Sequence, residues 1–408
     1  MQLDAVIFGG GVAGLWLLDR LTREGNHCLL LEAGTLGAGQ TIAAQGIIHG
    51  GMKYSLQGLL SKSARNIREM PAVWRDALLG RTTPVLTRTR VRAEECYLWQ
   101  TDSLTSRAGM LGARLALHVT PEPVSPEERP PALARVAGTV VRLPEQVLCV
   151  QSLLADLADQ YRSRLLQIDA QHGLTFELNS PGEVRAIILH SPSDRRPLRL
   201  QPRHVVFTAG AGNSTLRRLV GLDGESMQRR PLHMVLVRGG LPTLNGHCID
   251  GARTRVTITS DVDAAGRTIW QVGGQLAEDG TALAAPDLIR RARHELQAVL
   301  PEIDFTQSEW STCRVDRAEG ITAEGGRPDN VQVLCAGNVT TGWPAKLALA
   351  PVLAREIAAR ISAPTGNATQ NWAELADWPR PAVATPLWDE PGRNWVNLDR
   401  DPSAARAA

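Results

Sequence analysis

The first 34 residues contain an apolar run, a glycine-rich turn, an amphipathic stretch and a second apolar run. LDAVIF predicts a buried strand, and VAGLWLLDRLTREG carries apolar residues at helical spacing up to Gly25. HCLLLE predicts a second buried strand that ends at Glu32. This strand–helix–strand order predicts an α/β fold built on a Rossmann-like parallel sheet.

Apolar periodicity predicts further elements downstream. An amphipathic helix is expected over residues 55–80, with a buried side formed by Leu59, Leu60, Ile67, Met70 and Trp74. Alternating strands are expected within residues 217–280, followed by a helix over residues 285–303. These patterns predict a second, mixed-sheet α+β domain.

The turn after the first predicted strand has the spacing GxGxxG, from Gly9, Gly11 and Gly14. Gly9 allows a tight turn, Gly11 lets the backbone approach a pyrophosphate at the helix N-terminus, and Gly14 allows close helix–strand packing. Glu32 can accept hydrogen bonds from ribose hydroxyls, which disfavours a 2′-phosphate and therefore NADP. The motif predicts a dinucleotide site but leaves FAD and NAD open.

Length and composition narrow the class of protein. A chain of 408 residues with 43% hydrophobic residues can form two domains with real cores. The net charge of +2 gives no basis for binding nucleic acid. Six scattered cysteines without a CxxC pair predict reduced thiols, a cytoplasmic protein and no metal site. No apolar run is long enough to span a bilayer, although peripheral membrane contact stays open.

Two later segments repeat the strand-then-small-residue pattern. Residues 203–216 predict a strand that runs into Ala209, Gly210 and Gly212, where a cofactor could cross the backbone. Residues 330–361 predict a strand, a loop between Gly337 and Gly342, and a helix with Pro344 at its first position. Pro351 must kink or restart that helix.

These segments together resemble the D-amino-acid-oxidase-like superfamily of FAD oxidoreductases. The resemblance covers residues 1–60, 200–216 and 330–362, and it implies FAD rather than NAD. In that superfamily the last helix N-terminus faces the flavin pyrimidine edge. The implied cofactor contacts come from Gly9, Gly11, Val12, Ala13, Gly14, Glu32, Ala33, Gln40, Thr41, Gln45, Gly46, Ile47, Ala209, Gly210, Gly337, Gly342, Trp343 and Pro344.

The segment LGAGQTIAAQGIIHGGMKY, residues 36–54, runs along the flavin in such relatives. Its Ile48-to-Tyr54 part resembles glycerol-3-phosphate and L-2-hydroxyglutarate dehydrogenases, and its His49–Gly50–Lys53 spacing also resembles sarcosine-type oxidases. A His beside the ring can orient substrate or accept a proton, and Lys53 can support negative charge. The alternative interpretation is a His within an ordinary turn and a solvated Lys.

Two further cations are candidates for binding a substrate carboxylate. The superfamily often places an Arg on the strand before the last flavin strand, which implies Arg314 first and Arg317 second. Lys346 follows Gly342 at an offset similar to a substrate-binding Lys of sarcosine-oxidase relatives. The alternative for Lys346 is a solvated Lys at a helix start.

The resemblance implies two interleaved domains. Prolines and glycines punctuate the chain consistently with an FAD-binding domain and a substrate-binding domain. We expect the first over residues 1–82, 145–216 and 313–362, and the second over 83–144 and 217–312. Residues 363–408 predict an extended tail rich in Trp and Pro.

The predicted function is FAD-dependent oxidation of a small carboxylate substrate, with hydride transfer from the α-carbon to the flavin. The Ile-His-Gly-Gly run favours a 2-hydroxy acid or a polyol phosphate, whereas the Lys53 and Lys346 spacing favours an amino acid or N-methyl amine. Oxygen or a quinone-type acceptor would reoxidise the flavin. A non-catalytic flavin-binding subunit is the third alternative. Met52 and Lys53 replace the Leu-Arg of glycerol-phosphate enzymes, which puts a phosphate substrate in doubt.

Overall fold

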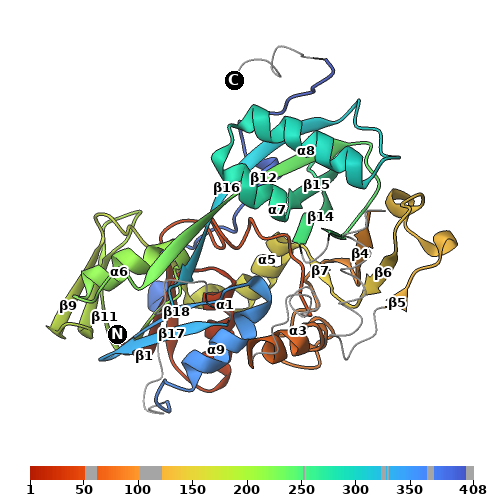
Figure 1. The fold of residues 1–408 in the computed structure, drawn as a ribbon. Helices are drawn as coiled ribbons and strands as arrows, with labels where there is room; N and C mark the ends of the chain where they lie inside the picture. The colour runs from red at the N-terminus through yellow and green to blue at the C-terminus, as the bar shows by residue number, and fades with distance from the viewer. Residues whose placement is uncertain are drawn as a thin grey trace.

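The computed structural model describes residues 1–50, 62–101, 122–250, 253–322, 328, 330–364 and 372–400. Two large sheets organise this part of the chain (Figure 1). A two-stranded sheet pairs β3 (Val91–Ala93) with β7 (Val147–Leu148). No helix among the described residues is long and apolar enough to cross a bilayer.

The first sheet is mainly parallel and confirms the predicted Rossmann-like fold. Its order is β17-β18-β11-β1-β2-β8, and the bounds are Gln332–Ala336, Val339–Trp343, Pro197–Phe207, Gln2–Phe8, Cys28–Glu32 and Leu165–Gln167. A hairpin of β9 (Leu174–Ser180) and β10 (Glu183–His190) extends from β11. Apolar residues on both faces bury the central strand β1, as a parallel strand requires.

Helices cover the first sheet. They are α1 (Val12–Arg23), α3 (Lys62–Leu78), α5 (Val150–Gln160), α6 (Asn213–Leu219) and α9 (Ala350–Ala358). α1 packs against both α9 and α5. Ile67, Met70 and Trp74 on α3 are buried as predicted, while Leu59 and Leu60 lie outside the described residues.

The second sheet forms the other predicted domain core, and α8 lies across it in Figure 1. Its order is β16-β12-β15-β14-β13-β4-β6-β5, with bounds Glu309–Gly320, Met227–Gly239, Thr268–Gly273, Arg253–Val262, Gly246–Asp250, Cys96–Gln100, Val140–Leu143 and Glu122–Pro123. α7 (Gln275–Asp279) and α8 (Ala285–Val299) complete it. The predicted domain boundary at residue 313 therefore falls inside β16, which belongs wholly to this sheet.

Short 3-10 helices link these elements. They are η1 (Pro126–Glu128), η2 (Pro131–Leu133), η3 (Arg162–Arg164), η4 (Gly210–Gly212), η5 (Gly280–Ala282), η6 (Leu347–Leu349), η7 (Trp372–Leu375) and η8 (Leu387–Asp389). The last two lie in the tail, which contacts both sheets. Val383 bridges to Leu36 beside the first sheet, and Val396 bridges to Trp310 on β16.

The prediction for residues 330–361 was wrong in detail. Instead of one strand and a loop between Gly337 and Gly342, β17 and β18 form an antiparallel hairpin with Gly337 at its turn. Gly342 lies within β18, and the helix α9 begins at Ala350 rather than at Pro344. Pro351 falls in the first turn of α9, where its missing N–H removes no helical hydrogen bond.

Candidate active site

The glycine-rich turn between β1 and α1 forms one wall of a cavity of about 810 Å³. Lining residues predicted from the motifs are Gly9, Gly11, Val12, Ala13, Glu32, Ala33, Gln40, Thr41, Ala209, Gly210 and Pro344. They come from the carboxyl ends of β1, β2 and β11 and from two loops. This edge of a parallel α/β sheet is where such folds bind nucleotides.

The three motif glycines have different surroundings. Gly9 has φ +103°, and a Cβ there would lie 2.5 Å from Cα of Ala209. A Cβ at Gly14 would lie 2.0 Å from the carbonyl oxygen of Gly9, so this residue permits the helix to pack on the turn. At Gly11, the N-cap of α1, a Cβ would meet only Oγ1 of Thr41, at 3.1 Å. Gly11 thus leaves room for a pyrophosphate beside the helix N-terminus.

Glu32 ends β2 at the wall of the same cavity. Its Oε2 accepts a hydrogen bond from the backbone N–H of Gly10 at 2.6 Å, and its Oε1 accepts one from Gly34 at 2.8 Å. These two bonds fix the carboxylate beside the glycine-rich turn. The arrangement fits the ribose of a dinucleotide such as FAD.

A second cavity, of about 420 Å³, adjoins the first, and Val12, Gln40, Thr41, Val315 and Pro344 line both. Val12 of α1 and residues from 40–49 and 344–347 form one side of it, and strands β12, β14 and β16 contribute to the other. Gln45, Gly46, Ile47, His49 and Lys346 are the other predicted site residues on its wall. The two cavities together can hold an elongated cofactor and a small substrate.

Hydrogen bonds from both domains hold the segment that precedes His49. Gln45 donates from Nε2 to the carbonyl oxygens of Thr257 at 3.1 Å and Gln271 at 2.8 Å. The buried Arg92 donates to the carbonyl oxygen of Gln45, and Asp261 pairs with Arg92. Burial lowers the pKa of the Arg92 guanidinium, and Asp261 opposes that shift. The segment is therefore anchored beside the second cavity.

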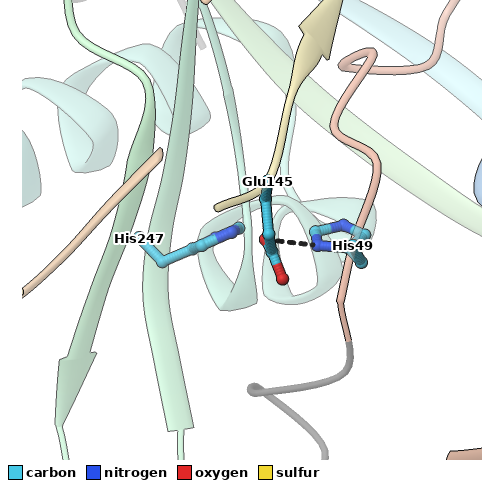
Figure 2. Close-up of side chains that lie close together, drawn as sticks. All are labelled: His49, Glu145 and His247. Atoms are coloured by element: carbon cyan, nitrogen blue, oxygen red, sulfur yellow. Dashed lines mark ion pairs between the residues drawn. The ribbon is translucent and has the colours of Figure 1, made fainter. Parts of the chain in front are cut away.

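Pairing with residues 146–148 then directs His49 toward Glu145. Gly46 has φ +76°, and the N–H of Ile48 donates to the carbonyl oxygen of Gln146 at 2.8 Å. Nδ1 of His49 lies 3.4 Å from Oε2 of Glu145, and the His49 side chain is 21% exposed. Glu145, which is 3% exposed, lies between His49 and the buried His247 of β13 (Figure 2).

The two candidate arginines of β16 point to different places, because side chains alternate along a strand. Arg314 lies on the wall of the first cavity and donates to the carbonyl oxygens of Thr281 at 3.0 Å and Leu283 at 2.8 Å. Arg317 lies on the wall of the second cavity, 3.4 Å from Glu278. The geometry thus favours the second candidate, Arg317, over Arg314 for contact with a substrate there.

Some of the other predicted site residues line a cavity and some do not. Lys346 lines the second cavity at the start of η6, and Pro344 lines both cavities. Gly337, Gly342 and Trp343 line neither. At Gly342 a Cβ would lie 2.8 Å from Ile357 of α9, so this glycine serves helix packing. Gly51, Met52, Lys53 and Tyr54 lie outside the described residues.

Sequence reasoning missed Glu145, His247, Arg230 and Arg253. Arg230 stands opposite Arg317 across the β12–β16 pair and is ion-paired with Glu319. Arg253 lies at the start of β14, on the wall of the second cavity. Arg230, Arg253 and His247 line the second cavity, and Glu145 contacts His49 beside it. Alternating strand patterns carry no sign that these positions lie together, so only the strand pairing could have revealed them.

Comparison with known proteins identifies the class. The family model "DAO: FAD dependent oxidoreductase" matches residues 4–360. The chain therefore belongs to this family and is an FAD-dependent enzyme, which sets aside the non-catalytic alternative. The geometry of the first cavity agrees with this cofactor, which when bound would lie against the glycine-rich turn and Glu32.

Particular relatives are similar over nearly the whole chain. A probable FAD-dependent oxidoreductase of Pseudomonas aeruginosa is 39% identical over 395 residues, covering 95% of this chain and 98% of the relative. The crystal structure of this same Pseudomonas aeruginosa protein has a TM-score of 0.78, with 35% identity over 95% of this chain and 98% of its own.

More distant structures share the fold. Glycine oxidase from Geobacillus kaustophilus has a TM-score of 0.64 at 17% identity, covering 90% of this chain and 96% of that one. L-α-glycerophosphate oxidase from Mycoplasma pneumoniae, with FAD bound, has a TM-score of 0.60 at 12% identity, covering 96% of this chain and 98% of that one.

Proposed function

We propose that this enzyme oxidises a small 2-hydroxy acid, with hydride passing from the α-carbon to FAD. The observation that carries the proposal is the charge of the second cavity. Arg230, Arg253, Arg317 and Lys346 line it, from four different elements, against the single carboxylate Glu278 among its described lining residues. Such a surface favours an anionic substrate.

The carboxylate would bind at the β16 side of the cavity. A guanidinium such as that of Arg317 can take a carboxylate through two parallel hydrogen bonds, which orients the α-carbon. Lys346 adds a second positive charge from the loop after β18. The α-hydrogen can then face the flavin, which when bound supplies the hydride-accepting group.

The imidazole of His49 supports the choice of a hydroxyl beside that carbon. It lies on the cavity wall, held toward Glu145. A side chain in this place can hold a substrate hydroxyl and accept its proton while the hydride leaves the carbon, so that a carbonyl forms. In an amine substrate the nitrogen can lose its proton to solvent before binding, so it depends less on such a group.

Oxidation of an amino acid or N-methyl amine is the second candidate. It is favoured by the place of Lys346 on the cavity wall and by structural relatives named glycine oxidase and iminodiacetate oxidase. Those relatives are 17% and 15% identical to this chain, so their names support the reaction class only as an analogy.

Anaerobic reduction of the bound flavin distinguishes the two candidates. The purified holoenzyme would be mixed without oxygen with matched pairs of 2-hydroxy and 2-amino acids that share a carbon skeleton. Bleaching of the flavin absorbance by a hydroxy acid, and not by its amino partner, is expected. Bleaching by amino acids alone would overturn the hydroxy-acid proposal in favour of the second candidate. Reoxidation with oxygen or a soluble quinone would then identify the acceptor.

A further inference from the structure

Two histidines and a glutamate from distant parts of the sequence meet at the edge of the second cavity (Figure 2). His49 comes from the segment after β2, Glu145 from the turn between β6 and β7, and His247 from β13. Their candidate ligand atoms all lie within 4.8 Å of one another. Two imidazoles and one carboxylate are a donor set that binds divalent transition metals.

Two of the three residues are buried, and two polar atoms of the cluster have no hydrogen bond among the described residues. Glu145 is 3% exposed and His247 is 2% exposed. Nδ1 of His49 and Oε2 of Glu145 are 3.4 Å apart, and neither has a hydrogen-bond partner in the part of the chain that the structure describes. Because a buried carboxylate oxygen that accepts no hydrogen bond is costly, a bound cation would stabilise the cluster.

Glu145 and His247 each have a second polar atom that contacts a group outside the cluster. Oε1 of Glu145 accepts a hydrogen bond from the N–H of Gly50 at 2.6 Å. Nδ1 of His247 lies 2.8 Å from Oγ1 of Thr257. Both contacts fix the orientation of the side chain and direct its remaining ligand atom into the cluster. Metal-binding His and carboxylate residues are typically oriented by outer contacts of this kind.

We propose that His49, Glu145 and His247 form a site for one divalent transition-metal ion, with Zn²⁺ as the test ion. Ligand atoms around a tetrahedral Zn²⁺ lie roughly 3–3.5 Å apart, so the cluster must contract on the order of 1 Å. Three protein ligands leave a coordination position open, as in catalytic rather than structural zinc sites. His49 and His247 also line the second cavity, so the open position faces it.

A metal in this place would deepen the proposed function. If that function holds, the ion would bind an oxygen of the substrate, either the 2-hydroxyl or a carboxylate oxygen. The metal site itself does not depend on the reaction, because its evidence is the cluster and not the substrate. Metal binding and flavin reduction can therefore be measured separately on the same holoenzyme.

The test measures metal binding to holoenzyme stripped with a chelator. Its FAD content would be checked by absorbance, and Zn²⁺ binding by calorimetry and by elemental analysis after dialysis. One ion per chain is expected. Thr257→Val removes an outer contact and should weaken Zn²⁺ binding by about 10–100-fold. Glu145→Gln keeps the side-chain shape but removes a proposed ligand, so it should weaken Zn²⁺ binding more than Thr257→Val does.

His27→Gln is the matched control, because His27 pairs with Asp4 at 3.6 Å and belongs to no three-residue His, Cys, Asp or Glu cluster among the described residues. It should bind Zn²⁺ as the unaltered enzyme does. The proposal is overturned if FAD-loaded enzyme shows no saturable binding, or if Glu145→Gln and His247→Ala both bind Zn²⁺ with unchanged affinity. Reduction of the flavin by a hydroxy acid in metal-free enzyme would leave the proposed function standing while removing the metal from it.

Discussion

At the residue scale, strand geometry directs the two candidate arginines of β16 to different cavities. Arg314 and Arg317 are three positions apart on β16, so their side chains leave opposite faces of the strand. The sequence resemblance favoured Arg314, but its guanidinium binds two backbone carbonyl groups at the first cavity. Arg317 lines the second cavity and carries the carboxylate-binding proposal.

Replacing Arg317 with Met should weaken binding of a carboxylate substrate or inhibitor by about 10–150-fold. This range corresponds to the loss of about 1.5–3 kcal/mol for hydrogen bonds to a charged group. The measurement is the Kd of an anionic inhibitor from its perturbation of the flavin spectrum. Arg314→Met serves as the matched control and should change that Kd by less than about threefold, since its hydrogen bonds lie elsewhere. Equal effects of the two substitutions would contradict the assignment.

The glycine-rich turn gives a second prediction at this scale. Gly14→Ala places a Cβ 2.0 Å from the carbonyl oxygen of Gly9, so α1 must move away from the turn. We expect most of the purified variant to lack FAD, as measured by the ratio of flavin to protein absorbance. At Gly34 a Cβ would meet only Oε1 of Glu32, at 3.7 Å, so Gly34→Ala should retain FAD. A Gly14→Ala protein with full flavin content would refute this account.

At the element scale, the end of the first sheet differs most from the sequence prediction. β17 and β18 form a hairpin, and α9 begins seven residues after Trp343, the last residue of β18. Val339, Thr340 and Thr341 continue the sheet because they pair with β11 in parallel. Apolar periodicity could not show this pairing, since VTTGW carries neither an apolar run nor a regular apolar–polar alternation.

Two substitutions test where α9 begins: one removes a proline and the other introduces one. Pro351→Ala should change the free energy of unfolding by less than about 1 kcal/mol, because Pro351 lies in the first turn and no hydrogen bond is lost. Ala354→Pro, in the buried middle of α9, should cost about 3 kcal/mol or more. Thermal unfolding followed by circular dichroism would measure both. A large effect of Pro351→Ala would mean that the helix begins earlier.

At the scale of the whole molecule, the tail joins the two domain cores. Trp378 is 2% exposed and donates from Nε1 to the carbonyl oxygen of Gln167 at 2.8 Å. Leu387 and Pro391 contribute to the wall of the first cavity. Its extended path gives it contacts with β8, β16 and the segment after β2, so it completes the dinucleotide cavity as well as covering the fold.

Trp378→Ala should destabilise the protein by about 3–5 kcal/mol, as expected when a buried Trp is removed. Trp395 offers a control in the same tail, because it is partly exposed and stacks under the guanidinium of Arg238 at 4.0 Å. Trp395→Ala should cost about 1 kcal/mol. Urea unfolding of both variants would show the order of effects, and a reversed order would contradict this packing.

The sequence by itself determined the first strand, the glycine-rich turn, α1 and Glu32, because these features depend on neighbours along the chain. Local spacing also predicted a dinucleotide site, and the family resemblance then implied FAD; the place of His49 beside the flavin stays a prediction. Only the tertiary structure decided which residues share the second cavity. Arg230, Glu145 and His247 come from separate strands and turns, and strand pairing rather than sequence spacing brings them to Arg317 and His49. Contacts between residues far apart in the sequence produce no periodic pattern along the chain, so only the tertiary structure shows them.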